Sequence, residues 1–199
     1  MLVFRGGLIM SGNGKVSADT PDWSRERCVG FWDPGRRLLR SIRSYQKWKN
    51  RGIPGRWLTR YWVLQHRFWS VVTGADLPLN CDIGGGLILM HPNGVVIFPG
   101  SSIGPNCLIF QQVTIGTGGP KSGAPVLGGN VCVGAGAKIL GGVKVGDHAL
   151  IGANAVVLQD VPQGATAVGV PATIVGVNAH RESATLAETY LPQTTSPPR

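Results

Sequence analysis

The stretch LILMHPNGVVIF, residues 87–98, places one ionisable side chain, His91, among apolar and turn-forming residues. A buried imidazole costs free energy unless a hydrogen bond satisfies it. An imidazole also has a pKa near about 6.5, which suits a general base that takes a proton from a hydroxyl group. His91 is therefore either a core histidine that bonds a backbone carbonyl or a group that does chemistry, and the rest of the chain must decide.

A second unusual stretch is the glycine-rich segment GTGGPKSGAP, residues 116–125. A nucleotide-binding P-loop needs glycine directly before its lysine, and here Pro120 precedes Lys121. The segment is therefore not predicted to be a P-loop. Because it interrupts a regular repeat, described next, we expect it to lie at a binding edge of the fold.

The chain carries an internal repeat of six residues. Aliphatic residues occupy ten of eleven positions in one frame, and Lys121 is the exception. An earlier set, Ile83, Leu89 and Val95, is offset by two residues, and His91 lies near the offset. A period of six is not helical and predicts an all-β solenoid, with a short strand on each of three faces and a turn at each corner. The ten aliphatic residues are Ile97, Ile103, Ile109, Ile115, Leu127, Val133, Ile139, Val145, Ile151 and Val157.

The N-terminal part differs from the rest in charge and aromatic content. Residues 1–75 carry 14 Lys/Arg against 4 Asp/Glu and all six tryptophans, whereas residues 76–199 carry 5 against 6. We predict four regions: an irregular arm at 1–33, a basic Trp-rich segment of two helices at 34–74, the solenoid at 75–177, and a C-terminal cap with a disordered tail at 178–199. Met1 and Met10 are both possible start residues.

Two interpretations of the basic helices stay open. Arginine beside tryptophan is typical of a segment that lies on a membrane surface. The same composition fits two helices that pack their tryptophans on the solenoid and turn arginine outward. Nucleic acid is not an expected partner, because no base-reading motif accompanies the charge.

The cysteines and the start of the chain bear on its location. Neither C-x-x-C spacing nor a histidine at metal-ligand spacing accompanies Cys28, Cys81, Cys107 and Cys132. We interpret them as reduced, mostly buried thiols and expect no metal site. The opening residues contain no apolar run of signal-peptide or transmembrane length. We therefore expect a cytoplasmic protein, with peripheral contact at the inner face of the membrane as an option.

Three stretches resemble the hexapeptide-repeat acyltransferases, most closely their serine O-acetyltransferase branch: IGPNCLIFQQVTIG, VGAGAKILGGVKVGDHALIGANAVVLQDVP and AVGVPATIVG. The resemblance covers about residues 74–177. It implies a left-handed parallel β-helix and a homotrimer. It also implies that acetyl-CoA is the co-substrate and binds in clefts between neighbouring subunits.

The resemblance implies catalytic roles for two residues. His91 aligns with the family's catalytic histidine, and Asp76, fifteen residues earlier, aligns with the aspartate that orients it. A carboxylate bonded to one ring nitrogen fixes the tautomer and stabilises the imidazolium. The alternative for Asp76 is a solvated turn or cap residue, because the family's Ile-His-Pro after this aspartate is replaced here by Leu77, Pro78 and Leu79.

The resemblance also implies a binding site for acetyl-CoA. The glycine-rich segment resembles the family's loop beside the thioester, where backbone N–H groups can stabilise an oxyanion. Lys121 either meets a CoA phosphate or is a solvated loop lysine, and Ala135 and Ala153 match small positions along the CoA channel. The predicted binding residues are Gly116, Thr117, Gly118, Lys121, Ala135 and Ala153.

The departures from the family concern the acceptor. Met90 replaces an aspartate that helps to hold the amino acid, and Gly123, Ala124 and Pro125 replace an Arg-His-Pro. A desolvated serine zwitterion needs partners for both charges. We therefore expect an acetyl-CoA-dependent O-acetyltransferase whose acceptor is a saccharide hydroxyl rather than free serine. The alternatives are a serine O-acetyltransferase and an inactive solenoid that serves as a scaffold.

Overall fold

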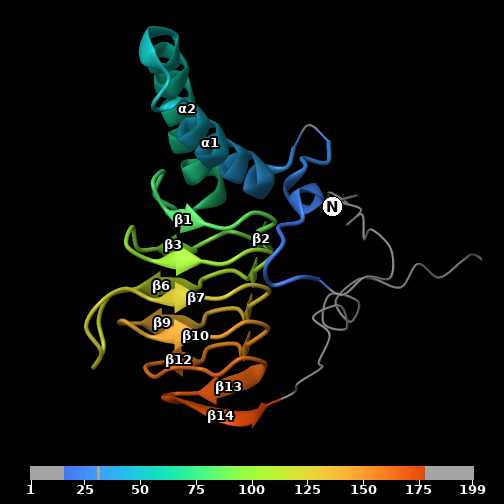
Figure 1. Ribbon diagram of the computed structural model, residues 1–199, viewed down its shortest axis with the longest axis vertical. Coiled ribbons are helices and arrows are strands. Elements are labelled where there is room, and N and C mark those ends of the chain that lie inside the picture. The colour runs from blue at the N-terminus through green and yellow to red at the C-terminus, as the bar shows by residue number, and fades with distance from the viewer. Residues whose placement is uncertain (1–15, 31, 178–199) are drawn as a thin grey trace, which may run out of the picture.

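The computed structural model describes residues 16–30 and 32–177 (Figure 1). Within them, a stack of short strands follows two helices, and the strands form three faces of a parallel β-solenoid. The proposed C-terminal cap and tail and the choice between Met1 and Met10 lie outside the described residues.

The strands pair in three sheets, and up to β12 each sheet collects every third strand of the stack. The sheet orders are β1-β4-β7-β10, β14-β13-β11-β8-β5-β2 and β12-β9-β6-β3. All the pairs are parallel except β13 with β14, which is antiparallel and closes the far end. The strands are β1 (Asp82–Ile83), β2 (Ile88–Leu89), β3 (Val96–Ile97), β4 (Ser102–Ile103), β5 (Leu108–Ile109), β6 (Thr114–Gly116), β7 (Val126–Leu127), β8 (Cys132–Val133), β9 (Lys138–Leu140), β10 (Lys144–Val145), β11 (Leu150–Ile151), β12 (Val156–Val157), β13 (Ala165–Gly169) and β14 (Ala172–Val177).

The repeat is confirmed by burial. All ten aliphatic residues of the main frame are buried, and strand pairing stacks them face by face, for example Ile103 on Leu127. Burying apolar surface of this kind is the main favourable term in folding. The column of aliphatic side chains therefore holds the coils together.

The offset at the start of the repeat has a structural cause. Ile97, not Val95, pairs with Ile115 of the next coil, so the step from Leu89 to Ile97 is eight residues rather than six. Val95 is buried at the corner before its strand, as Val113 is one coil later. The two extra residues lie in the turn that contains His91.

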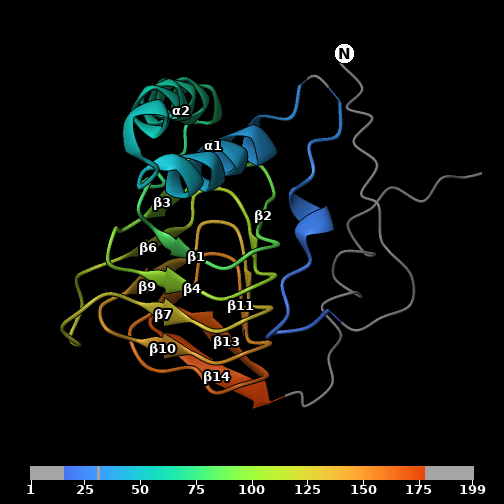
Figure 2. The same cartoon turned by 45° about the horizontal axis from the view of Figure 1, so that its top comes forward.

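Two helices cap the first coil. Helix α1 (Pro34–Trp48) and helix α2 (Gly52–Thr73) pack on one another, and α2 ends at Gly74, whose φ of 65° is left-handed. Side chains from both helices donate to carbonyls at the end of the solenoid: Arg43 to Ile83 and Gly84, Gln46 to Leu79 and Cys81, and His66 to Leu77. Figure 2 shows α1 between α2 and the first strands of the stack. None of the described helices is both long and apolar enough to cross a membrane.

The arm before the helices follows one corner of the solenoid. It was predicted to be irregular, but it contains a 3-10 turn, η1 (Trp23–Glu26), which Asp22 caps. Asn106 fixes the arm, because its amide accepts from the N–H of Asp22 and donates to the carbonyls of Ser17 and Thr20. The arm therefore packs as part of the fold (Figure 2).

Candidate active site

His91 lies in the turn between β2 and β3. Its φ of 58° is left-handed, a region that few non-glycine residues adopt. The side chain is exposed, not buried as its apolar neighbours suggested, because the longer turn carries it away from the core. Among the described residues its ring nitrogens have no hydrogen-bond partner, so the interpretation of His91 as a satisfied core histidine is wrong. The exposed imidazole can therefore contact a ligand.

Asp76 lies at the edge of the first coil, beside the strand that follows His91. Its N–H donates to the carbonyl of Val95 over 2.8 Å, its carbonyl accepts from the N–H of Ile97 over 3.0 Å, and it forms a parallel bridge with Val96. The carboxylate is exposed. Within the described chain it makes no hydrogen bond to His91, so the catalytic pairing of the two residues stays a prediction.

The glycine-rich segment leaves the solenoid after β6 and returns at β7. Gly118, Gly119 and Gly123 have φ values of 107°, 94° and 114°, which a residue with a Cβ rarely adopts. Two hydrogen bonds hold the base of the loop to the next coil, from Gly141 to the Gly116 carbonyl and from Gly142 to the Lys121 carbonyl. The loop is exposed around Thr117 and Gly118, so its N–H groups can meet a ligand.

Lys121 has a partner within the chain. Its Nζ lies 2.7 and 2.8 Å from the two carboxylate oxygens of Asp160. The hydrogen bond from Lys121, together with one from the backbone N–H of Lys144, holds the pKa of Asp160 below its ordinary value. Sequence reasoning missed Asp160, because only the coil register brings residue 160 next to residue 121. The predicted contact between Lys121 and a CoA phosphate stays a prediction, and it requires the lysine to share or leave Asp160.

The predicted site residues fall on two corners of the solenoid. We call the turns at residues 90–95, 110–113, 134–137 and 152–155 the histidine corner; they lead into β3, β6, β9 and β12. His91, Ala135 and Ala153 lie there, on the first, third and fourth of these levels. We call the turns at residues 98–101, 117–125 and 141–143, which follow β3, β6 and β9, the loop corner. Thr117, Gly118 and Lys121 lie there, across the width of the face from His91.

The residues that depart from the family pattern lie beside these corners. Met90, directly before His91, is half-buried. Ala124, at the end of the loop, packs near Gly100 of the preceding coil on the same corner. Neither residue offers a charged group to an amino acid acceptor.

The cysteines are unpaired, and three of them are buried. Burial raises the pKa of the Cys81 and Cys107 thiols to about 12 and that of Cys132 to about 11. These three thiols stay protonated near neutral pH and are poor nucleophiles. Within the described residues, no three His, Cys, Asp or Glu side chains gather as a metal site would require.

Comparison with known proteins identifies relatives of the solenoid. The bacterial transferase hexapeptide family (six repeats) matches residues 124–159. The serine acetyltransferase of Synechococcus elongatus is 43% identical over 107 residues, which are 53% of this chain and 44% of the relative. The chain therefore spans about half the length of the curated relatives it matches.

Solved structures that are similar to this chain are also serine acetyltransferases. The serine acetyltransferase of Vibrio cholerae is 35% identical with a TM-score of 0.62, over 75% of this chain and 57% of that one. The Brucella abortus serine acetyltransferase in complex with coenzyme A is 31% identical with a TM-score of 0.63, over 73% and 57% of the two chains.

Proposed function

We propose that this chain, whose solenoid belongs to the hexapeptide-repeat transferases, moves the acetyl group of acetyl-CoA to a hydroxyl group. The observation that carries the proposal is the exposed imidazole of His91, held in a left-handed turn that is two residues longer than the repeat requires. The relatives of this chain by sequence and by structure are named serine acetyltransferases, and the structure of one of them was solved with coenzyme A. A cytoplasmic location is part of the proposal.

The proposed mechanism is direct transfer with one base. His91 takes the proton of the acceptor hydroxyl as its oxygen attacks the thioester carbonyl, and Asp76 stabilises the imidazolium. The tetrahedral intermediate then collapses, the C–S bond breaks, and the imidazolium returns its proton to the thiolate of CoA. N–H groups of the loop around Gly118 stabilise the oxyanion. Because the three buried thiols stay protonated, none of them serves as an acyl relay.

The same geometry supports a site shared between subunits. His91 and the loop lie on different corners of one chain, so a second chain has to bring its loop to the first chain's histidine corner. A cyclic trimer supplies that contact three times by symmetry. Ala135 and Ala153, which are small and lie on the histidine corner, leave room for the pantetheine arm of acetyl-CoA between the subunits.

Serine is the better supported acceptor. The sequence led us to expect a saccharide, but the relatives found by sequence and by structure are named for serine. A saccharide hydroxyl remains a second candidate on one observation: Met90 and Ala124 give no charged partner to an amino acid. The two candidate acceptors differ in charge. Serine carries an ammonium and a carboxylate group that both need partners in the site, whereas a saccharide hydroxyl carries no charge.

The deciding experiment measures CoA release from acetyl-CoA by the purified full chain. We expect release that depends on L-serine and exceeds hydrolysis without acceptor. Release with sugars or an oligosaccharide panel, and none with serine, would replace serine by the second candidate. Silence with every acceptor would refute the transferase proposal and favour the inactive scaffold.

A further inference from the structure

Helix α2 exposes an apolar stripe that nothing in the described chain covers. The stripe residues recur at spacings of four and three, which places them along one side of the helix. Each is between 50% and 84% exposed. They are Trp57, Tyr61, Leu64, Phe68 and Val71. A continuous exposed apolar surface of this length marks an interaction site rather than scattered surface residues.

Three exposed arginines flank one side of the stripe. Arg56, Arg60 and Arg67 recur at spacings of four and seven, so they form a parallel row along the same helix. The Arg60 guanidinium lies over the ring of Trp57, 5.3 Å from its centroid. Aromatic rings with arginine beside them suit the boundary between lipid headgroups and acyl chains.

The charge of the two helices indicates what kind of partner covers the apolar stripe. Residues 34–74 contain ten Lys/Arg and no Asp or Glu. A second copy of this chain would bring ten further cations to the same contact with no acids to pair them, which opposes self-association. An anionic surface is complementary to the stripe and to the arginine row together.

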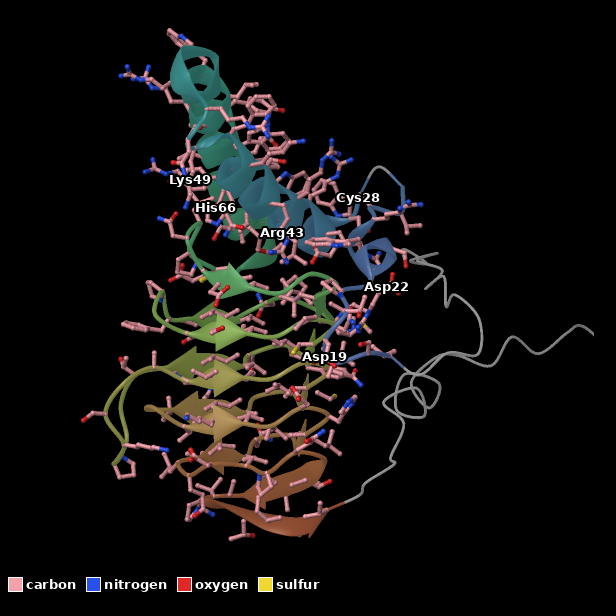
Figure 3. The ribbon with its side chains drawn as sticks, viewed as in Figure 1. Asp19, Asp22, Cys28, Arg43, Lys49 and His66 are labelled. Carbon is pink, nitrogen blue, oxygen red and sulfur yellow. The ribbon has the colours of Figure 1, made fainter. Side chains whose placement is uncertain are left out.

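The position of the helices allows such a contact. Helix α2 lies at the end of the molecule opposite β14 (Figures 1 and 2), and Figure 3 shows side chains with nitrogen tips around the helix pair. The solenoid ties the hairpin down from the other side through Arg43, Gln46 and His66, so the stripe faces outward. We propose that α2 lies flat on an anionic lipid bilayer, with its apolar stripe in the headgroup boundary and the solenoid projecting away from the membrane.

The test is co-sedimentation of the full chain with vesicles. We expect binding to phosphatidylcholine vesicles that contain phosphatidylglycerol, little binding to pure phosphatidylcholine, and release as salt rises. Leu64→Glu should weaken partitioning at least about tenfold, because it places a charge within the stripe. Exchanging Arg56, Arg60 and Arg67 for glutamine should remove the preference for the anionic lipid.

A matched control separates the stripe from a general effect of charge. Val175→Glu introduces the same charge at an exposed apolar position on β14, at the far end, and should bind vesicles like the parent chain. The proposal is overturned if the parent chain stays in the supernatant with both vesicle types, or if Val175→Glu weakens binding as much as Leu64→Glu. It is also overturned if Leu64→Glu lowers the mass of the assembly in light scattering, which would assign the stripe to a second copy. None of these readouts depends on acetyl transfer.

Discussion

At the scale of single residues, the left-handed positions separate His91 from the repeat. Among residues 16–30 and 32–177, six non-glycine residues have positive φ. Five of them stand three positions before an inward aliphatic residue, where the corner of each coil demands this conformation: Asn106, Gln112, Asn130, His148 and Asn154. His91 stands six positions before Ile97, so the repeat does not explain it. Unusual backbone that the fold does not require is often found at functional sites.

The first prediction concerns His91→Asn. Asparagine tolerates positive φ as histidine does but has no basic nitrogen, so the turn should persist while the base is lost. We expect kcat/KM to fall by about 10²–10⁴. The free energy of unfolding should change by less than about 0.5 kcal/mol, because the side chain is exposed. Steady-state CoA release and a thermal melt measure the two quantities.

The chain offers a control for this variant in its other left-handed histidine. His148 is exposed with a φ of 58°, and its Nδ1 lies 2.9 Å from the Nδ2 of Asn130. It lies in the turn between β10 and β11, which belongs neither to the histidine corner nor to the loop corner. His148→Asn should therefore leave kcat/KM unchanged. Equal losses in the two variants would mean that His91 acts through the turn and not as a base.

The second prediction concerns the thiols. With a pKa near about 12, only about one Cys107 thiol in 10⁴ is ionised at pH 8 in the folded chain. Iodoacetamide should therefore label Cys81, Cys107 and Cys132 slowly until the chain unfolds, as mass spectrometry can follow. Unfolded thiols ionise at lower pH than these folded ones, so stability should fall as pH rises from about 9 towards about 12. Rapid labelling of Cys107 in the folded protein would contradict its burial.

At the scale of elements, the sequence predicted the solenoid well and its first turn poorly. A period of six identifies inward residues, but the corner two positions earlier is also apolar, as at Val113 and Val131. The repeat therefore assigned Val95 to an inward position, although Ile97 occupies that position in the structure. Only strand pairing separates the two positions. His91 is exposed because its turn is two residues longer than the repeat requires. Its apolar neighbours in the sequence therefore do not indicate that its side chain is buried.

The loop illustrates a second limit of the same kind. Its interruption of the repeat was visible in the sequence, but its anchor was not. Lys121 and Asp160 are 39 positions apart and meet because the loop reaches the second level beyond its own. Contacts between levels depend on the length of each turn, which composition does not reveal.

The third prediction concerns that anchor. Asp160→Asn keeps a hydrogen-bond acceptor for the N–H of Lys144 but removes the charge that holds Lys121. We expect trypsin to cut after Lys121 several-fold faster, because the loop is released. Overall stability should change by no more than about 1 kcal/mol, as is usual for an exposed ion pair. Mass spectrometry of the early fragments measures the cutting rate.

Cleavage after Lys138 provides the internal reference. Its Nζ donates to the carbonyl of Gln112 and does not involve Asp160. Higher salt should speed cutting after Lys121 in the parent chain, because an exposed pair is screened, and should have little effect in Asp160→Asn. If the two chains are cut at the same rate after Lys121, the pair does not hold the loop.

At the scale of the whole molecule, a single chain does not complete the proposed site. In the proposed trimer the histidine corner of one chain meets the loop corner of another, and cyclic symmetry makes every site identical. The helices lie at one end of the stack and the loop partway along it (Figure 1). Contact of α2 with a membrane would therefore leave the proposed sites along the solenoid accessible.

The fourth prediction tests the shared site with two inactive chains. One carries His91→Asn, and the other lacks residues 117–122, which restores a six-residue step from Ile115 to Leu127 and so allows the coil to close. Each chain alone should be inactive, since each site lacks one component. Co-refolded in equal amounts, they should recover about a quarter of the parent activity, because one contact in four joins an intact histidine to an intact loop.

The recovered activity separates a shared site from one within a chain. If His91 and the loop of the same chain act together, every chain in the mixture is defective, and mixing restores nothing. Light scattering on each variant must first give the mass of the parent assembly, so that inactivity cannot arise from dissociation. A mixture of two batches of the His91→Asn chain controls for the refolding procedure and should stay inactive. Because the histidine and loop corners lie on opposite edges of one face, recovery is the outcome that we expect.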